Sequence, residues 1–240
     1  MRSLSFLALP VLAALTLTLP AERAGAAAGG FAVDYAIRDF SRLALGTGAQ
    51  MQVRVGPSWS IHADGPAAVL ATMRVEREGD TLKIARRDPR AKGDPALERQ
   101  VRFTVTMPSL SAATLGGSGA ITIDRVSGPH FSAAVGGQGA ITIDALATDA
   151  AEVSIGGTGR VAAGGRVRDL KVSIGGAGTL RAPALHAAHA EVSVAGSGSV
   201  LASVEGDARV SSVGRGTIDL GPRARCDVSK MGSALIRCGA

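Results

Sequence analysis

The chain has 240 residues, of which 46% are hydrophobic, 19% charged and only 3% aromatic, and its formal net charge is +6. The apolar fraction is too high and the charge too low for an intrinsically disordered chain. The 32 glycines do not recur at every third residue, which excludes collagen, and a single long apolar run excludes a bundle of transmembrane helices. Because so few aromatic residues cannot fill a wide core, we expect a narrow interior lined by small aliphatic side chains.

Residues 1–26 have the pattern of a secretory signal peptide. Arg2 precedes an apolar run over residues 4–19, and small residues follow at 24–26. A retained membrane anchor is the alternative, but Pro10 interrupts the run, which is also shorter than the ~20 apolar residues of a spanning helix. We therefore expect an exported protein, periplasmic or secreted, whose mature chain has no membrane anchor.

The charge of the mature chain bears on its partners. Removal of residues 1–26 leaves 24 basic and 19 acidic residues, a net charge of +5. A basic exported protein favours anionic components of the cell envelope as partners. Nucleic acid is not expected as a partner, because the aromatic side chains on which bases stack are scarce.

Residues 27–110 are predicted to form an N-terminal β cap region. Residues 40–55 read as two alternating strands around a G-T-G turn, and residues 73–84 as a hairpin. Residues 86–99 are polar and contain two prolines, which indicates an exposed loop, and residues 101–107 form the strand that leads out of the region. Such a cap would cover one end of the domain that follows.

Residues 111–240 consist of repeats of one motif. Each unit carries a G-x-G doublet after an apolar stretch, and the first glycine of the doublet, or its equivalent in the last unit, is Gly117, Gly137, Gly157, Gly176, Gly196, Gly214 or Gly232. The step of 18–20 residues is too regular to arise by chance.

Within each unit, apolar residues alternate with polar residues, as a β-strand requires. Four residues after the first glycine, every unit has an aliphatic residue: Ile121, Ile141, Val161, Leu180, Val200, Ile218 and Ile236. A unit of this length without a helix cannot bury its own apolar face, so the units must stack. We predict an all-β fold, a right-handed parallel β-helix (β-solenoid) of about seven rungs with the N-terminal β-strand cap. An antiparallel β-sandwich is the alternative, which the constant step disfavours.

Four sequence features in this order resemble the head GIN domain family of bacterial proteins. They are the opening F-x-x-L-x-L-x-x-G at residues 40–48, the G-D-T-L-K-I segment at 79–84, the V-T-M-P-S-L segment at 105–110 and the run of G-x-G repeats, and together they cover about residues 38–237. The resemblance implies a β-solenoid protein of the bacterial envelope or surface with a role in adhesion.

The last two units depart from the repeat. Their apolar residue stands one position later than in the other units, at Val213 and Met231, and Ala234 replaces the second glycine of the last doublet. We therefore expect the final rungs to be irregular.

No catalytic constellation is recognisable. Asp124 and Asp144 occupy the same position in adjacent units, and stacked carboxylates can serve acid–base chemistry or bind a hard cation. No third acidic ligand accompanies them, so we interpret them as solvated turn residues. His186 and His189 also lack a third ligand and are interpreted as surface histidines rather than zinc ligands. We expect no catalytic residue, no metal site and no cofactor.

The two cysteines, Cys226 and Cys238, both fall at inward-facing positions of the last unit, six residues before and six residues after Gly232. Exported proteins fold in an oxidising environment. We predict a disulfide bond between them that locks the exposed end of the solenoid.

A ladder of serines beside the glycine turns is the predicted binding surface. It comprises Ser154, Ser173 and Ser193, with Arg160, Arg181 and Arg215 just past the turns to engage anionic groups. The first functional hypothesis is a non-enzymatic adhesion or binding protein whose partner is an envelope glycan or another surface protein. The alternative is a polysaccharide-acting β-helix enzyme, a lyase or hydrolase, which rests on fold analogy alone.

Overall fold

A computed structural model describes residues 30–239, so the predicted signal peptide at 1–26 lies outside the described residues. No helix between residues 30 and 239 has the length and apolar character needed to cross a bilayer. The elements, in chain order, are β1 (Phe31–Asp34), β2 (Arg42–Leu45), β3 (Gln50–Val55), β4 (Ser60–Gly65), α1 (Ala67–Leu70), β5 (Met73–Glu78), β6 (Thr81–Arg86), α2 (Pro95–Glu98), β7 (Arg102–Met107), β8 (Ala112–Leu115), β9 (Ala120–Val135), β10 (Ala140–Gly157), β11 (Arg160–Gly176), β12 (Thr179–Gly196), β13 (Ser199–Val204), β14 (Asp207–Gly214), β15 (Thr217–Asp219), β16 (Arg225–Gly232) and β17 (Leu235–Arg237).

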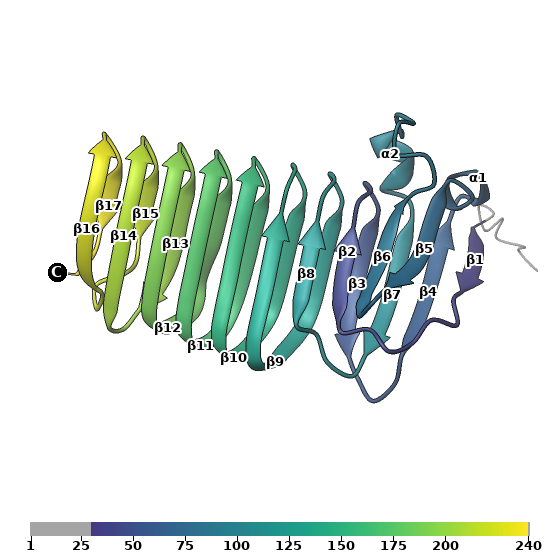
Figure 1. The fold of residues 1–240 in the computed structure, drawn as a ribbon, viewed down its shortest axis with the longest axis horizontal. Helices are drawn as coiled ribbons and strands as arrows, with labels where there is room; N and C mark the ends of the chain where they lie inside the picture. The colour runs from purple at the N-terminus through teal and green to yellow at the C-terminus, as the bar shows by residue number, and fades with distance from the viewer. Residues whose placement is uncertain (1–29, 240) are drawn as a thin grey trace, which may run out of the picture.

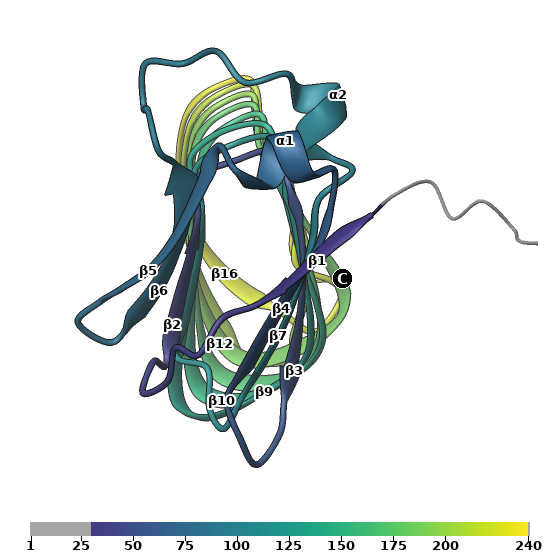
Figure 2. The same cartoon turned by 90° about the vertical axis from the view of Figure 1, so that its right-hand side faces the viewer.

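Each repeat unit forms one coil of a parallel β-solenoid, as predicted (Figure 1). A strand leads to a glycine turn, and the next strand leaves the turn, runs along the other side of the interior and bends into the following coil. The strands on the two sides of the turns form two walls around a narrow interior (Figure 2). The repeated small aliphatic side chains fit such an interior, because each coil contributes only one layer of them.

We name the walls by their side chains. The serine wall consists of the strands before the turns, namely residues 130–135, 150–157, 169–176 and 189–196 of β9 to β12 together with β14 and β16, and it continues through β8, β2 and β6. The threonine wall consists of the strands after the turns, namely residues 120–123, 140–143, 160–162 and 179–182 together with β13, β15 and β17, and it continues through β3 and β7.

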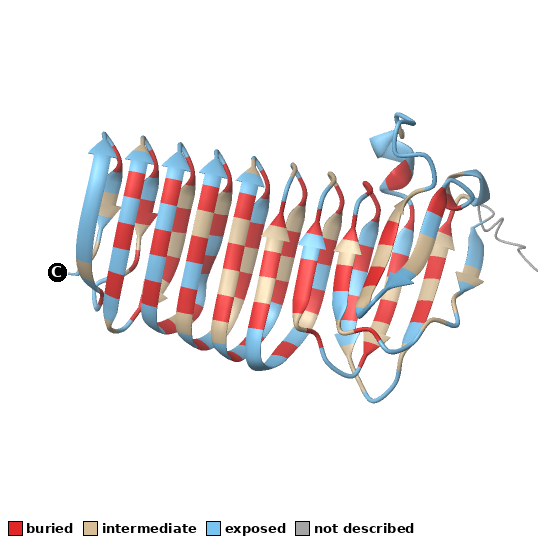
Figure 3. Ribbon diagram, viewed as in Figure 1, coloured by how far each residue is buried: buried red, intermediate tan, exposed pale blue. Residues whose placement is uncertain are grey.

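The predicted column of aliphatic residues is confirmed in the threonine wall. The seven residues pair in register from Ile121 in β9 to Ile236 in β17, and all are buried except Ile236, which is partly buried in the final coil. Buried residues alternate with exposed or partly exposed residues along the strands of both walls, except in β16, which is exposed along most of its length (Figure 3). This alternation is the period of two that the sequence shows.

The number of turns is smaller than predicted. The solenoid has about six turns rather than seven. The reason is geometrical, because the seven glycine turns from Gly117 to Gly232 bound only six complete coils.

The N-terminal strands extend the stack out of chain order. β2 pairs in parallel with β8 on one side and with β6 on the other, and β3 pairs in parallel with β9 on one side and with β7 on the other. These two strands therefore lie between two segments that follow them in sequence. The Gly46–Gly48 turn between them stacks on the first repeat turn, where Gly116 N donates to Leu45 O at 2.8 Å. Residues 40–55 therefore repeat the strand–turn–strand geometry of the solenoid, and the domain boundary at residue 110 stays a prediction.

Antiparallel strands close the N-terminal end of both walls. β5 pairs with β6 at the end of the serine wall, and β4 pairs with β7 and β1 at the end of the threonine wall. The change from parallel to antiparallel pairing ends the repeat. The opposite end has no such strands among the described residues, because β16 and β17 each pair with one neighbour.

The strands of the final coils stay in register with the preceding coils, and two apolar side chains are exposed as a result. Val213 pairs with Met231 in the outward-facing column, so the shifted apolar residues are 53% and 72% exposed. The preceding Ser212 points inward, and its buried hydroxyl has no hydrogen-bond partner in the described structure. Backbone pairing between rungs therefore prevails over the local apolar pattern.

Cys226 and Cys238 are bonded to each other in the structure, with their Cα atoms 6.0 Å apart. Cys226 lies in β16 and Cys238 directly follows β17, so the bond joins the two walls at the last coil. It links the two strands that have a pairing partner on one side only.

The glycine turns give the first prediction. A Cβ atom at Gly157 would lie 2.7 Å from Gly137 O, whereas a Cβ at Gly156 would meet nothing within 4 Å. Gly157→Ala should therefore lower the free energy of unfolding by about 1–3 kcal/mol, since the rungs must separate to admit the methyl group. Gly156→Ala is the matched control, and Ala195 occupies its equivalent position two coils later. Equal effects of both variants in urea denaturation would contradict this account.

The second prediction concerns the two cysteines. Thiol titration of the denatured, unreduced protein should detect no free thiol. The Cys226→Ser/Cys238→Ser variant should lose about 3 kcal/mol of stability, the loop-closure entropy of a short loop. Two titratable thiols in the unreduced wild type would rule the bond out.

Candidate binding surface

Five serines form one column on the outer face of the serine wall. Ser154, Ser173 and Ser193 pair in register, and Ser211 and Ser229 continue the column in β14 and β16. Neighbouring rungs of a parallel sheet lie about 4.8 Å apart, so the hydroxyls repeat at that spacing. The structure thus brings the three predicted serines together on one face, which is built by the neighbouring strands β10, β11 and β12 (Figure 1).

The three predicted arginines do not lie with the serines. Arg160 and Arg181 belong to the threonine wall, where Arg160 pairs with Thr179 and Arg181 with Ala162. Arg215 lies in a glycine turn, on the edge between the walls, where its N–H donates to Gly196 O. A flat partner lying on the serines would therefore not reach Arg160 and Arg181 at the same time.

A column of charged residues beside the serines was missed in the sequence. It runs in register through Glu152, Lys171, Glu191, Arg209 and Asp227, and its charge alternates in sign at every rung. None of the five side chains forms an ion pair with another residue of the 30–239 segment. Each stands five residues before the first glycine of its unit, so an alignment of the repeats would have revealed the column.

A second column of polar residues runs parallel to the first. Asp169 pairs with His189, and Asp207 pairs with Arg225 two rungs further on. Arg225 Nε donates to Asp207 Oδ1 at 2.8 Å, and this hydrogen bond lowers the pKa of Asp207 and raises that of Arg225. The charged column and this second column cover the part of the serine wall away from the turns. Positive and negative groups alternate there.

The two columns line an open hollow in the serine wall. Its volume is about 350 Å³, and its charged or titratable lining residues are His130, Glu152, Asp169, Lys171, His189 and Glu191. The hollow spans neighbouring rungs, and acidic and basic groups occur on both sides of it. Such a surface suits a partner that itself carries charges of both signs.

The residues considered as acid–base or metal candidates have structural contacts. Asp124 Oδ1 accepts hydrogen bonds from Val55 N at 3.0 Å and Arg125 N at 2.6 Å, so it holds the end of β3. His186 Nδ1 lies 3.3 Å from Glu205 Oε1. Between residues 30 and 239, no group of three or more His, Cys, Asp or Glu side chains is placed to hold a metal ion.

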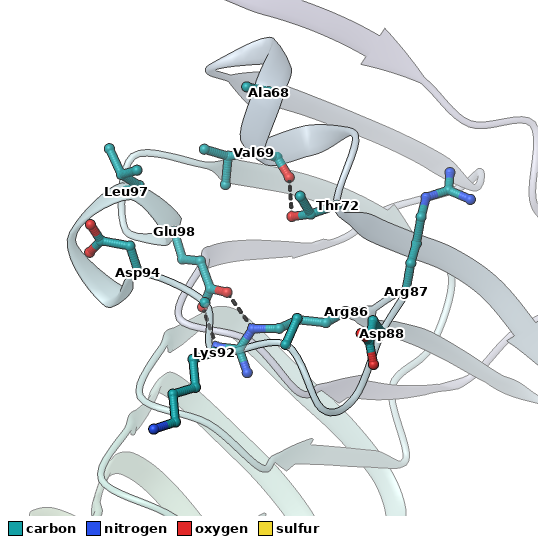
Figure 4. A pocket seen from close by; sticks show the side chains of 12 residues that line it. Ala68, Val69, Thr72, Arg86, Arg87, Asp88, Lys92, Asp94, Leu97 and Glu98 are labelled. Carbon is teal, nitrogen blue, oxygen red and sulfur yellow. Dashed lines mark hydrogen bonds and ion pairs between the residues drawn. The ribbon is translucent and has the colours of Figure 1, made fainter.

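A second hollow lies in the N-terminal cap, between α1, α2 and the loop that joins β6 to α2. Its volume is about 430 Å³. Val69 and Leu97 form apolar walls, and the Arg86 side chain crosses the base towards Glu98 (Figure 4). The six charged side chains that line it are balanced in sign, namely Arg86, Arg87, Lys92, Asp88, Asp94 and Glu98.

Glu98 ties this cap to the solenoid. Its side chain is buried, and the carboxylate accepts hydrogen bonds from Nε of Arg86, from Nη2 of Arg86 at 2.8 Å, and from Gly48 N of the Gly46–Gly48 turn at 2.6 Å. The hydrogen bonds to Glu98 raise the pKa of Arg86. One carboxylate thus joins α2, the end of β6 and the Gly46–Gly48 turn.

This contact gives the third prediction. Glu98→Gln should destabilise the protein by about 1.5–3 kcal/mol, because it removes the negative charge that accepts three hydrogen bonds at a buried side chain. Glu78→Gln is the control, since it also removes a carboxylate paired with a cation, Lys83, but at an exposed site. Thermal unfolding should show a large shift for Glu98→Gln and little change for the control; two similar shifts would show that the Glu98 carboxylate has no special role.

Comparison with solved structures shows the same fold in other bacterial proteins. A protein described as a putative adhesin from Bacteroides fragilis superposes with a TM-score of 0.77 at 19% identity, over 87% of this chain and 96% of that chain. A protein described as a putative lipid binding protein from Parabacteroides distasonis gives 0.67 at 18% identity, over 88% and 97%. A protein described as a putative adhesin from Parabacteroides merdae gives 0.66 at 13% identity, over 87% and 95%.

Comparison with sequence families is more specific. No curated protein matches the chain in sequence. The family model described as "Putative auto-transporter adhesin, head GIN domain" matches residues 39–222, which is more than half of the chain and includes both the cap and most of the repeats. The chain therefore belongs to the head GIN domain family.

Proposed function

We propose that the protein is an exported, non-enzymatic binding protein of the bacterial envelope or surface, and that it holds another surface component on its serine wall. The description of the family as a putative adhesin supports a binding role. The N-terminal sequence supports export to the periplasm or the cell exterior. The partner class is an envelope glycan or another surface protein.

The observation that carries the proposal is the regularity of the serine wall. Its serine column and its alternating charge column repeat at every rung from β10 to β16. A regular polar ladder suits an extended partner with a similar repeat, and many weak contacts together can give firm attachment. The open hollow on this wall favours contact with a surface over the enclosure of a small substrate.

The fourth prediction tests the serine wall. The Ser154→Glu/Ser173→Glu/Ser193→Glu variant should lose retention on envelope fractions, because three carboxylates are added along the contact line. The control carries the same three charges on the other wall, as Thr122→Glu/Thr142→Glu/Thr217→Glu, and should be retained like the wild type. Both variants are first compared with the wild type by circular dichroism.

If the serine variant is still retained on envelope fractions at moderate salt, the serine wall is not the binding surface. Loss of retention in both variants would show that added negative charge alone prevents binding, and would also contradict the proposal. The anionic partners expected for a basic protein make this control necessary.

A further inference from the structure

The outer face of the serine wall has a charge pattern that is complementary to itself. In four consecutive rungs, from β11 to β16, the exposed column reads Lys171, Glu191, Arg209 and Asp227. Its signs are therefore positive, negative, positive and negative. When a second copy of such a column is related to the first by a twofold axis through the midpoint of the column, each charge lies opposite a charge of the other sign.

The midpoint lies between β12 and β14. A twofold axis that runs parallel to the strands at this point places Glu191 opposite the partner's Arg209. It also places Lys171 opposite the partner's Asp227. Because the operation is twofold, each of these contacts occurs twice in an isologous interface.

The second column obeys the same symmetry. The axis places Asp169 opposite the partner's Arg225, and His189 opposite the partner's Asp207, which lies one residue before the paired Ala208. No like charges meet in this column. Two columns with different sequences thus support the same axis.

Two exposed apolar residues, Val213 and Met231, fall on the same face. In the column nearest the turns, Val213 comes opposite the partner's Ala195, and Met231 comes opposite the partner's Gly175. A Cβ at Gly175 would meet nothing within 4 Å, so there is open space for the methionine. Burial of Val213 and Met231 would account for apolar residues at outward positions that other coils fill with glycine or alanine.

Other axes are less favourable. An axis centred on the rung of β12 would place Lys171 opposite the partner's Arg209, and like charges would meet. An axis between β11 and β12 would place His130 opposite the partner's Arg225 and Asp207 opposite an alanine. The charged column is complementary about this axis too, with Glu152 opposite the partner's Arg209. The second column, in which all charges find a partner, therefore favours the axis between β12 and β14.

We propose that a second copy of this chain binds to the serine wall about this twofold axis, with the two solenoid axes antiparallel and the two walls face to face. The proposal rests on the proposed function of the serine wall and names one partner for it. Four rungs at about 4.8 Å and seven residues at about 3.3 Å cover roughly 450 Å² of each copy. That area is at the low end for specific protein interfaces, so the dimer should be weak and depend on concentration and on salt.

The fifth prediction is a charge-reversal experiment on the purified mature protein, measured by sedimentation equilibrium over a range of concentrations. The wild type should form dimers. Glu191→Lys and Arg209→Glu should each weaken the dimer more than about tenfold, because each variant brings like charges together twice. An equimolar mixture of the two variants should form heterodimers. In the mixed pair, the introduced lysine meets the introduced glutamate, and the unchanged Arg209 of one variant meets the unchanged Glu191 of the other.

Arg181→Glu, which makes the same charge change on the threonine wall, is the matched control and should dimerise like the wild type. A wild type that stays monomeric up to millimolar concentration would overturn the proposal. So would two variants that dimerise normally alone, or that fail to associate when mixed although both are folded by circular dichroism. A monomeric wild type whose retention on envelope fractions still depends on the serines would leave the proposed function in place and refute this inference alone.

Discussion

The close approach of backbones at the glycine turns governs every other feature of the solenoid. A Cβ atom at Gly137, Gly157 or Gly176 would lie less than 3 Å from the carbonyl oxygen of the glycine in the preceding turn. Only glycine allows successive turns to stack at the rung spacing of a parallel sheet. The stacked turns in turn fix the register of both walls, because each wall starts from the same turn.

In-register stacking converts a linear repeat into columns. The aliphatic residues four positions after each first glycine become one inward-facing column, and the serines three positions before it become one outward-facing column. The same rule produces the alternating charges at Lys171, Glu191 and Arg209. A binding surface on this fold is therefore a set of ladders, and it suits partners that also repeat, among which a second copy of the chain has the matching spacing by construction.

The two ends of the stack are treated differently. At the N-terminal end, antiparallel strands stop the repeat, and Glu98 joins the cap to the turn at Gly48. At the other end, the described residues stop at an open coil that is crossed by the bond between Cys226 and Cys238. The shifted apolar residues of the last two coils, Val213 and Met231, are exposed on the outer face of the serine wall.

The repeat in the sequence was enough to predict the solenoid, the buried column and the serine column, because its period and the alternation within each unit are local properties. That β2 and β3 enter the stack between later segments could be learned only from the folded chain, since strand order depends on long-range pairing. The fold also placed Arg160 and Arg181 on the threonine wall, whereas Ser173 lies on the serine wall. Each arginine follows a glycine turn, and that turn reverses the chain onto the other side of the interior. A short separation in sequence across a turn is therefore a poor guide to which face of a solenoid a side chain occupies.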